Sequence, residues 1–293
     1  MKKVILFILI QFICLTALVV QVYAQHSIEI QRHAAKGEYY KALVEYEKLP
    51  KRRATSAAVT AAARSAWGLG LPERAIQEYE TALQDENLTS LDRGRIYFSR
   101  AIIELQENRL QTAVLYAERS ANLIKEPGPF KSKVLLAWGH SLAEMGLYAA
   151  AEEKFLEALA DAELEDKPEL YFQIAKSQMR LGKSEIARDN LEKIPLRNEH
   201  TPQAMRFLAQ LALDSKNYEE AEFWLTRGRS EYPESFLDSW VDYVLIRSAI
   251  HSGQEKEVSS ILEDAKKKYP PSDDWLGLLI AAAEAYLWGE EVD

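Results

Sequence analysis

The sequence is poor in cysteine and histidine, and this scarcity excludes several kinds of protein. One of its 293 residues is cysteine, Cys14, and five are histidine. A lone thiol forms no intramolecular disulfide and no multi-thiolate metal site, so stability must come from packing. The histidines, which lack the spacing of metal ligands, are His26, His33, His140, His200 and His251. We therefore predict a chain without a metal site and without a cofactor.

Catalytic signatures and an excess of positive charge are missing too. The sequence contains no glycine-rich phosphate loop, no nucleophile elbow and no paired-histidine helix motif. Adjacent glutamates such as Glu152 and Glu153 point about 100° apart on a helix, so they indicate a solvated face rather than a catalytic pair. With 36 Lys and Arg against 45 Asp and Glu, the net charge of −9 lacks the basic footprint of a nucleic-acid-binding protein. The chain is predicted not to be an enzyme.

The N-terminus is typical of an export signal. Two lysines after the initiator methionine precede an almost continuously apolar run over residues 4–20. Val22 and Ala24 then offer suitable side chains for cleavage after position 24. The sequence therefore predicts a signal peptide over residues 1–24 and a periplasmic or secreted protein.

An uncleaved anchor in the inner membrane is the alternative, because residues 4–24 are long enough to span a bilayer. Gln11 and Gln21, and the lack of stop-transfer charges after the run, favour cleavage. Ile13 stands directly before Cys14, whereas lipoprotein signals have a small residue at that position, so lipidation is not expected. Cleavage would remove two of the 36 Lys and Arg, leaving 34 against 45 Asp and Glu and a net charge of −11.

The rest of the chain is a repeat built around short turns, most of them at glycine. The turn residues, spaced 33 to 38 positions apart, are Gly37, Gly70, Asn108, Gly146, Gly182, Lys216, Gly253 and Gly289. Five positions after a turn stand Ala42, Ala75, Ala113, Ala151, Ala187, Ala221 and Val258. Nine positions after it stand Tyr46, Tyr79, Ala117, Phe155, Leu191, Leu225 and Leu262. Seven positions before it stand Ile30, Ala63, Ala101, Gly139, Ala175, Ala209, Ile246 and Ala282.

This pattern predicts pairs of antiparallel helices. Apolar residues recur every three or four positions, as on one face of a helix. Small residues on both sides of a turn let two helices approach closely, and the larger ninth residue fills the space between neighbouring pairs. Prolines fall between the pairs, where they break no helix interior. No alternating β-pattern of useful length occurs, so the predicted fold is all-α.

Four segments resemble the turn and second helix of the tetratricopeptide repeat family: GEYYKALVEYEKL, GLPERAIQEYETAL, GLYAAAEEKFLEAL and KNYEEAEFWLTRG. The resemblance implies a right-handed α-solenoid over residues 25–293, with about seven repeats and a capping helix. The expected repeats cover residues 25–52, 56–86, 94–124, 132–161, 168–195, 202–233 and 239–270. The expected cap covers residues 273–289, with Ser272, Asp273 or Asp274 as its N-cap. The register of the third and seventh repeats stays open, because some residues depart from the types that are usual in the family: Leu49, Ala117, Ile194 and Val258.

In this family the first helix of each repeat lines a concave groove. Positions about 13, 10, 6 and 3 residues before each turn, in repeats two to seven, hold six basic residues and one acid, Glu169. A basic and aromatic groove suits an acidic or C-terminal segment of a partner protein. The predicted partner-binding residues are Arg64, Trp67, Arg95, Phe98, Lys133, His140, Phe172, Lys176, Arg206, Trp240, Tyr243 and Arg247.

Two alternatives stay open for this groove. Its aromatic side chains, above all Phe98 and Phe172, could pack between neighbouring first helices instead of meeting a partner. A polyanionic component of the cell envelope could replace an acidic peptide on the same basic residues.

The last four residues, 290–293, are similar to the acidic tail through which cytosolic heat-shock chaperones engage tetratricopeptide proteins. The family's carboxylate clamp is not matched, since Ser27, Gln31 and Ala61 stand where it requires Lys, Asn and Asn. We interpret the tail as a frayed acidic terminus. Its capture by the groove of a neighbouring molecule, which would be a self-association, is the alternative.

Together these features predict an exported, non-enzymatic scaffold or adaptor that binds partner proteins. A membrane-tethered envelope assembly factor is the alternative if residues 4–24 are retained. A cell-wall enzyme built on a helical solenoid is less favoured, because no long segment outside the repeats could hold a catalytic module.

Overall fold

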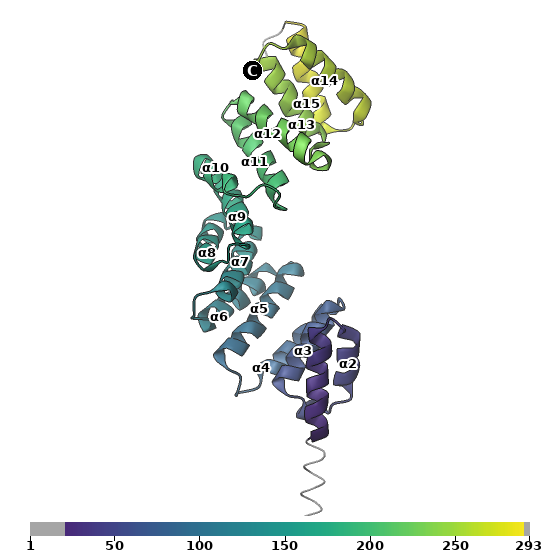
Figure 1. Ribbon diagram of the computed structural model, residues 1–293, viewed down its shortest axis with the longest axis vertical. Helices are drawn as coiled ribbons and strands as arrows, with labels where there is room; N and C mark the ends of the chain where they lie inside the picture. Colours follow the sequence, from purple (N-terminus) through teal and green to yellow (C-terminus); the bar gives the residue numbers. More distant parts are fainter. Residues whose placement is uncertain (1–20, 290–293) are drawn as a thin grey trace, which may run out of the picture. The chain divides into compact units, whose positions relative to one another are not determined.

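Two units of paired helices make up the described part of the chain. The computed structural model describes residues 21–289, which form helices and turns and no strand, so the predicted all-α repeat fold is confirmed. The chain divides after Asp161, and the two units follow one another along the colour bar of Figure 1. Most of the predicted signal peptide, residues 1–20, and the acidic tail, residues 290–293, lie outside the described residues. No helix within residues 21–289 is both long and apolar enough to cross a membrane.

The first unit contains four helix pairs. It begins with a helix over residues 21–35, α2 (Tyr39–Glu47) and the short 3₁₀ helix η1 (Lys51–Arg53). The next pairs are α3 (Ser56–Gly68) with α4 (Pro72–Leu83), α5 (Ser90–Gln106) with α6 (Leu110–Leu123), and α7 (Pro129–Glu144) with α8 (Tyr148–Asp161). In the last three pairs the two helices pack on one another, and α2, α4 and α6 also pack on the first helix of the following pair.

The second unit contains three pairs and a last single helix. The pairs are α9 (Lys167–Arg180) with α10 (Ser184–Glu192), α11 (Thr201–Asp214) with α12 (Tyr218–Glu231), and α13 (Ser239–His251) with α14 (Glu255–Lys268). The 3₁₀ helix η2 (Pro233–Phe236) joins α12 to α13. The last helix, α15 (Asp274–Leu287), packs on both α13 and α14.

The turns between paired helices adopt the conformation that the repeat predicts. All eight predicted turn residues, seven of them between paired helices and Gly289 after α15, have a positive φ, between 57° and 77°. Six of them are glycine, which adopts this region without a Cβ clash. At Lys216 the turn is closed by the amide of Asn217, which donates to the carbonyl of Ala212 at 2.8 Å. Such a bond satisfies one of the carbonyl groups left open at a helix C-terminus.

The small residues around the turns form the close contacts between paired helices. Ala63 and Ala75, on the two sides of Gly70, are both fully buried. Gly139 lies against the ring of Phe155, which is also fully buried. The expected role of the small residues is therefore confirmed at these pairs, whereas Phe155, a larger ninth residue, contacts Gly139 within its own pair.

Short polar side chains cap the N-termini of several helices, whereas Asp166 and Asp238, at the N-caps of α9 and α13, make no such bond. Thr55 and Thr89 accept hydrogen bonds from the amides of Ala58 and Asp92, at the starts of α3 and α5. Of the candidates for the last helix, Asp273 is the N-cap and accepts from the amide of Leu276 at 3.0 Å. Each cap satisfies an amide that the helix itself leaves unpaired.

Candidate functional site

A hollow of about 530 Å³ opens over first helices of the first unit. Its wall includes the helix over residues 21–35, α3 and α5, which belong to three successive pairs. Gln31 lines it from the first of these helices, Arg64 from α3 and Arg95 from α5. Two of the twelve predicted partner-binding residues, Arg64 and Arg95, thus border one hollow.

This hollow carries positive charge that is weakly paired. Arg64 is exposed, and no carboxylate pairs with it within residues 21–289. Arg95 lies 3.7 Å from Asp92, with side chains 59% and 49% exposed. An ion pair so exposed to water is weak. Since Asp92 is the one acid among the described lining residues, two guanidinium groups border the hollow with a single carboxylate.

Tyr79 of α4 also lines the hollow, although only 1% of it is exposed. Burial raises the pKa of its phenol above the ordinary value, against the lowering effects of a hydrogen bond with Ser99 and of the Arg64 charge. The hydroxyl is therefore neutral and able to donate. That hydroxyl is already hydrogen-bonded to Ser99 and almost fully buried, so the groups of the hollow suited to carboxylate oxygens are the two guanidinium groups.

The two aromatic residues predicted for the groove of the first unit do not line this hollow. Trp67 is half-buried, and its indole Nε1 donates to the Gln106 side chain at 3.2 Å. Phe98 is half-buried and meets the ring of Phe130 edge to face, with centroids 5.3 Å apart. Much of the surface of both rings is used inside the unit.

Lys133 and His140 lie on α7 of the same unit, and neither lines the hollow. Lys133 is exposed, whereas His140 is half-buried. The His140 imidazole meets the ring of Phe155 edge to face, with centroids 5.5 Å apart. His140 thus contributes to the packing between α7 and α8.

In the second unit, Phe172 belongs to the core. It is 4% exposed and stacks on Phe207, with centroids 5.6 Å apart, and on His200, with centroids 5.0 Å apart. Lys176 is exposed, and its ammonium lies 5.9 Å from the centroid of the Phe172 ring. Phe172 therefore packs between neighbouring first helices, which is the alternative that the sequence left open for it.

Arg206 is engaged by its own chain. Its guanidinium donates two hydrogen bonds to the carboxylate of Asp238, at 2.6 and 3.1 Å. It also lies 4.7 Å from the ring centroid of Trp240, which is buried. Burial opposes the charged form of Asp238, but the bonds from Arg206 prevail and hold the pKa of this carboxyl below its ordinary value. An acidic partner would have to compete with Asp238 for this arginine.

Tyr243 and Arg247 lie on α13 and are half-buried. The Tyr243 ring contacts Trp275 of α15, with centroids 5.1 Å apart. Arg247 donates to the hydroxyl of Tyr218 at 3.3 Å. The basic and aromatic positions predicted for the second unit are therefore tied largely to one another.

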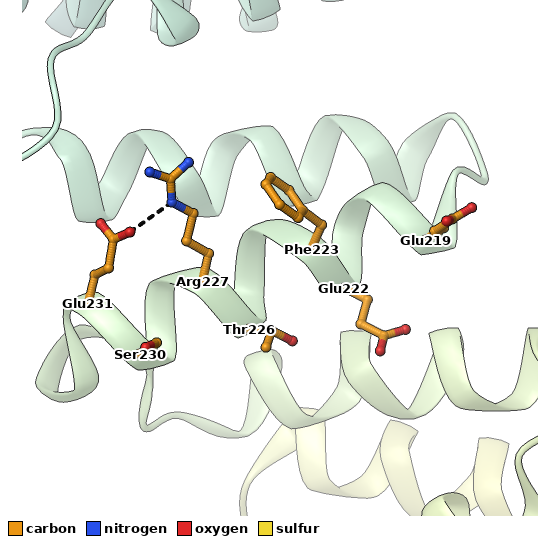
Figure 2. A pocket seen from close by; sticks show the side chains of 7 residues that line it. All are labelled: Glu219, Glu222, Phe223, Thr226, Arg227, Ser230 and Glu231. Carbon is orange, nitrogen blue, oxygen red and sulfur yellow. Dashed lines mark hydrogen bonds and ion pairs between the residues drawn. The ribbon is translucent and has the colours of Figure 1, made fainter.

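The prediction from first helices missed a surface on the second helix α12. Side chains of α12 line a shallow, open hollow of about 510 Å³ (Figure 2). Phe223 is 54% exposed there, and Arg227 donates to Glu231 at 2.8 Å. A neighbouring hollow of about 290 Å³, also bordered by Arg227, is lined by apolar residues such as Leu196 and Trp224. The one signal in the sequence is the aromatic pair at 223 and 224, since aromatic residues are unusual on a solvated helix face.

The described residues offer binding chemistry rather than metal chemistry. Within residues 21–289, no group of three or more His, Cys, Asp or Glu side chains is placed to hold a metal ion. What the hollow over α3 and α5 supplies is charge-assisted hydrogen bonding from two guanidinium groups, next to the side-chain amide of Gln31.

Comparison with known proteins matches the repeats to a family. The model of the family described as tetratricopeptide repeat matches residues 60–129 and residues 172–235. No curated protein sequence matches the chain.

Solved structures share the fold at low sequence identity. The apo form of RapI has a TM-score of 0.66 at 13% identity, covering 92% of this chain and 88% of its own. PilW, a widely conserved type IV pilus biogenesis factor, has a TM-score of 0.58 at 14% identity, covering 77% of this chain and 98% of its own. YrrB, a tetratricopeptide protein with an unusual peptide-binding site, has a TM-score of 0.57 at 14% identity, covering 70% of this chain and 97% of its own.

Proposed function

Because the chain is a tetratricopeptide repeat protein, we propose that it is a non-enzymatic scaffold that holds an acidic or C-terminal segment of a partner protein. The segment binds in the hollow over α3 and α5. The observation that carries this proposal is that Arg64 and Arg95 border the same hollow with one acid, Asp92, on a chain whose net charge is −9. Basic residues gathered on an acidic protein indicate selection for an anionic partner.

The lining of the hollow fits carboxylates better than other groups. Guanidinium groups bind carboxylate oxygens through paired, charge-assisted hydrogen bonds. Gln31 donates one amide hydrogen to the Ser27 carbonyl at 3.1 Å and keeps its second N–H for a backbone carbonyl of the same segment. A volume of about 530 Å³ admits a few residues, so the hollow acts as an anchor within a longer contact.

The contrast with the second unit supports this choice of site. Arg206 is bound to Asp238, and Phe172 and Trp240 are buried, so these positions have little left for a partner. Arg64 keeps its hydrogen-bonding capacity for a ligand. The first unit therefore carries the acidic-segment specificity of the scaffold.

Two relatives in fold agree with a binding role. YrrB has an unusual peptide-binding site, and PilW is a biogenesis factor of type IV pili. Peptide binding and participation in assembly are thus compatible with this arrangement of helices. We extend the first of these roles to the present chain.

The proposal includes export. The basic start and the apolar run over residues 4–20 support a cleaved signal peptide over residues 1–24, and hence a periplasmic scaffold. N-terminal sequencing of the protein from its native compartment checks this. A sequence starting at Gln25 is expected, whereas an intact N-terminus would favour the membrane-tethered alternative.

Binding is tested with a fluorescein-labelled peptide that contains three glutamates and a free C-terminal carboxylate. Fluorescence anisotropy is expected to show saturable binding that weakens as salt rises, because exposed charges are screened. The double variant Arg64→Glu, Arg95→Glu is expected to bind at least about tenfold more weakly, since each lost charged hydrogen bond contributes about 1.5 kcal/mol or more.

The matched control is Arg52→Glu, Arg53→Glu, which makes the same change in charge on exposed residues of η1 that do not line the hollow. This control should bind like the wild-type protein. A second control peptide, with glutamines in place of the glutamates and an amidated C-terminus, should not bind. Equal affinity of the wild type and the Arg64, Arg95 variant would refute the site.

A further inference from the structure

The second unit carries an apolar hollow beside the end of α10. Helix α10 has 9 residues, whereas α12 and α14 have 14 each, although all three begin two residues after a turn. Pro195 accounts for the early end, because proline has no amide hydrogen to donate and disfavours a helical residue before it. The hollow, of about 290 Å³, opens where a longer α10 would continue.

The floor of this hollow is apolar and its rim is exposed. The apolar lining residues that are buried are Leu191, Ile194, Ala204, Met205 and Leu208. Leu196, at the rim, is 53% exposed, and Trp224 of α12 is half-buried. An apolar cavity of about 150 Å³ is large enough to bind benzene. The Leu196 hollow, as we call it, therefore has room for one large apolar side chain of a partner.

The segment that carries Leu196 is held in place by hydrogen bonds. The amide of Arg197 donates to the hydroxyl of Tyr232, just after α12, at 2.9 Å. The hydroxyl of Thr201 donates to the carbonyl of Pro195 at 2.8 Å. The rim is thus already ordered, and binding does not have to order it first.

Next to this hollow, α12 presents an exposed aromatic ring beside an acid. Phe223 is 54% exposed and meets the ring of Trp224 edge to face, with centroids 5.1 Å apart. Figure 2 shows Phe223 and Arg227 pointing the same way from α12. Glu219 precedes Phe223 by four residues, so the two side chains are neighbours on the helix surface. An aromatic ring next to a carboxylate attracts a cation.

The charges that line the Leu196 hollow and the adjoining hollow on α12 favour a basic ligand. One base, Arg227, stands against four acids, Glu192, Glu219, Glu222 and Glu231. Arg227 is bonded to Glu231, and Glu222 accepts from the hydroxyl of Ser248. Glu192 and Glu219 are exposed, and no basic side chain pairs with either within residues 21–289. Two carboxylates therefore remain available to a partner.

We propose that this surface binds a basic segment of a partner protein through one large apolar side chain. The apolar side chain fills the Leu196 hollow. A lysine or arginine of the segment lies over the Phe223 ring beside Glu219, and another meets Glu192. An acidic segment would be repelled by the carboxylates of the two hollows.

This inference goes beyond the proposed function and is independent of it. The hollow over α3 and α5 in the first unit is assigned to an acidic segment. The surface on α10 and α12 adds a second site, on the other unit and for a partner of opposite charge. A chain with both sites holds two different partners.

Binding is tested on the full chain with a fluorescein-labelled peptide in which one tryptophan is flanked by two lysines on each side. Fluorescence anisotropy is expected to show saturable binding that weakens as salt rises, because exposed charges are screened. A peptide with glycine in place of the tryptophan should bind at least about tenfold more weakly, since the apolar burial is lost. A peptide with glutamates in place of the lysines should not bind.

Leu196→Asp tests the apolar part of the site. It places a charge at the rim and is expected to weaken binding at least about tenfold, because that charge would lose water when the hollow is filled. Helical content should not change, since Leu196 is exposed and lies outside the helices. The matched control is Leu164→Asp, at a residue 81% exposed that lines neither hollow, and it should bind like the wild type.

Glu192→Lys combined with Glu219→Lys tests the charged part. Attraction to the lysines of the peptide becomes repulsion, so binding should weaken about fivefold or more. The control Glu165→Lys with Glu263→Lys makes the same change in net charge at exposed residues that line neither hollow, and it should retain the affinity of the wild type.

NMR of isotope-labelled methionine methyl groups locates the apolar side chain. Met205 lines the Leu196 hollow, whereas Met145 and Met179 do not. The ring current of the bound tryptophan is expected to shift the Met205 methyl signal and to leave the signals of Met145 and Met179 unchanged.

Several outcomes would overturn the proposal. Equal affinity of the wild type and Leu196→Asp would do so, and so would a Met205 signal that does not move at saturation. A chain that sediments as a dimer without peptide, and as a monomer after Leu196→Asp, would assign the hollow to a second copy instead. The Arg64→Glu, Arg95→Glu variant should bind the basic peptide like the wild type, so the two binding proposals fail separately.

Discussion

The ring of Phe155 in α8 occupies the space that a side chain on Gly139 of α7 would need. Gly139→Ala is therefore expected to lower the free energy of unfolding by about 1–3 kcal/mol, because Phe155 is fully buried and the surrounding core must shift. Urea unfolding followed by circular dichroism measures this. The same substitution at the exposed Gly277, where nothing lies within 4 Å, should leave stability unchanged or raise it by up to about 1 kcal/mol. Equal effects at both positions would contradict the close contact.

Lys216 holds a left-handed conformation at the turn between α11 and α12, with φ of 58°. A residue with a Cβ pays about 1 kcal/mol for this region, whereas glycine does not. Lys216→Gly is thus expected to raise the free energy of unfolding by up to about that amount, seen as a higher urea midpoint. The reverse change, Gly70→Ala at φ of 72°, should lower it. A loss of stability in Lys216→Gly would show that the lysine side chain itself stabilises the turn.

The hydroxyl of Tyr46 donates to the buried carboxylate of Glu78 at 2.6 Å. Tyr46→Phe leaves this carboxylate without that partner and is expected to cost about 1–3 kcal/mol of stability. Tyr40 is 72% exposed. Tyr40→Phe removes the same phenolic oxygen and is therefore expected to change the free energy of unfolding by less than about 0.5 kcal/mol. Thermal unfolding of the two variants compares them directly, and equal melting temperatures would count against the buried bond.

The pair formed by Arg206 and Asp238 makes the stability depend on pH. Burial raises the pKa of Asp238, but hydrogen bonds from Arg206 outweigh it and lower the pKa below 3.8. A lowered pKa in the folded state means that the pair stabilises the fold above the pKa of the unfolded chain. This contribution is lost as pH falls through the folded-state value.

Arg206→Gln is expected to raise the pKa of Asp238 and to remove this acid-dependent loss. Carbon-detected NMR titration of the Asp238 carboxyl measures the shift. Lys176→Gln removes a positive charge elsewhere on the first helices and should leave that titration unchanged. An unaltered Asp238 titration in Arg206→Gln would show that the ion pair does not form in solution.

Much of the fold could be predicted because its rules are local. A turn such as Gly70 or Gly146 needs a left-handed residue, and the small residues five positions later follow from close helix packing, so both leave a periodic trace in the chain. The same locality explains the N-cap of the last helix, where three adjacent candidates included Asp273.

The site was less predictable because pairing across repeats is not local. Arg64 and Arg206 occupy groove positions of the same kind, but only Arg206 meets a carboxylate, 32 residues along the chain at Asp238. Whether Trp240 is buried, or Phe223 exposed on a second helix, depends equally on which side chains the neighbouring pair presents. The sequence by itself determined the helix pairs, their turns and the basic character of the first helices. Only the tertiary structure decided which of those charges and rings remain available, because burial and ion pairing are properties of contacts between repeats.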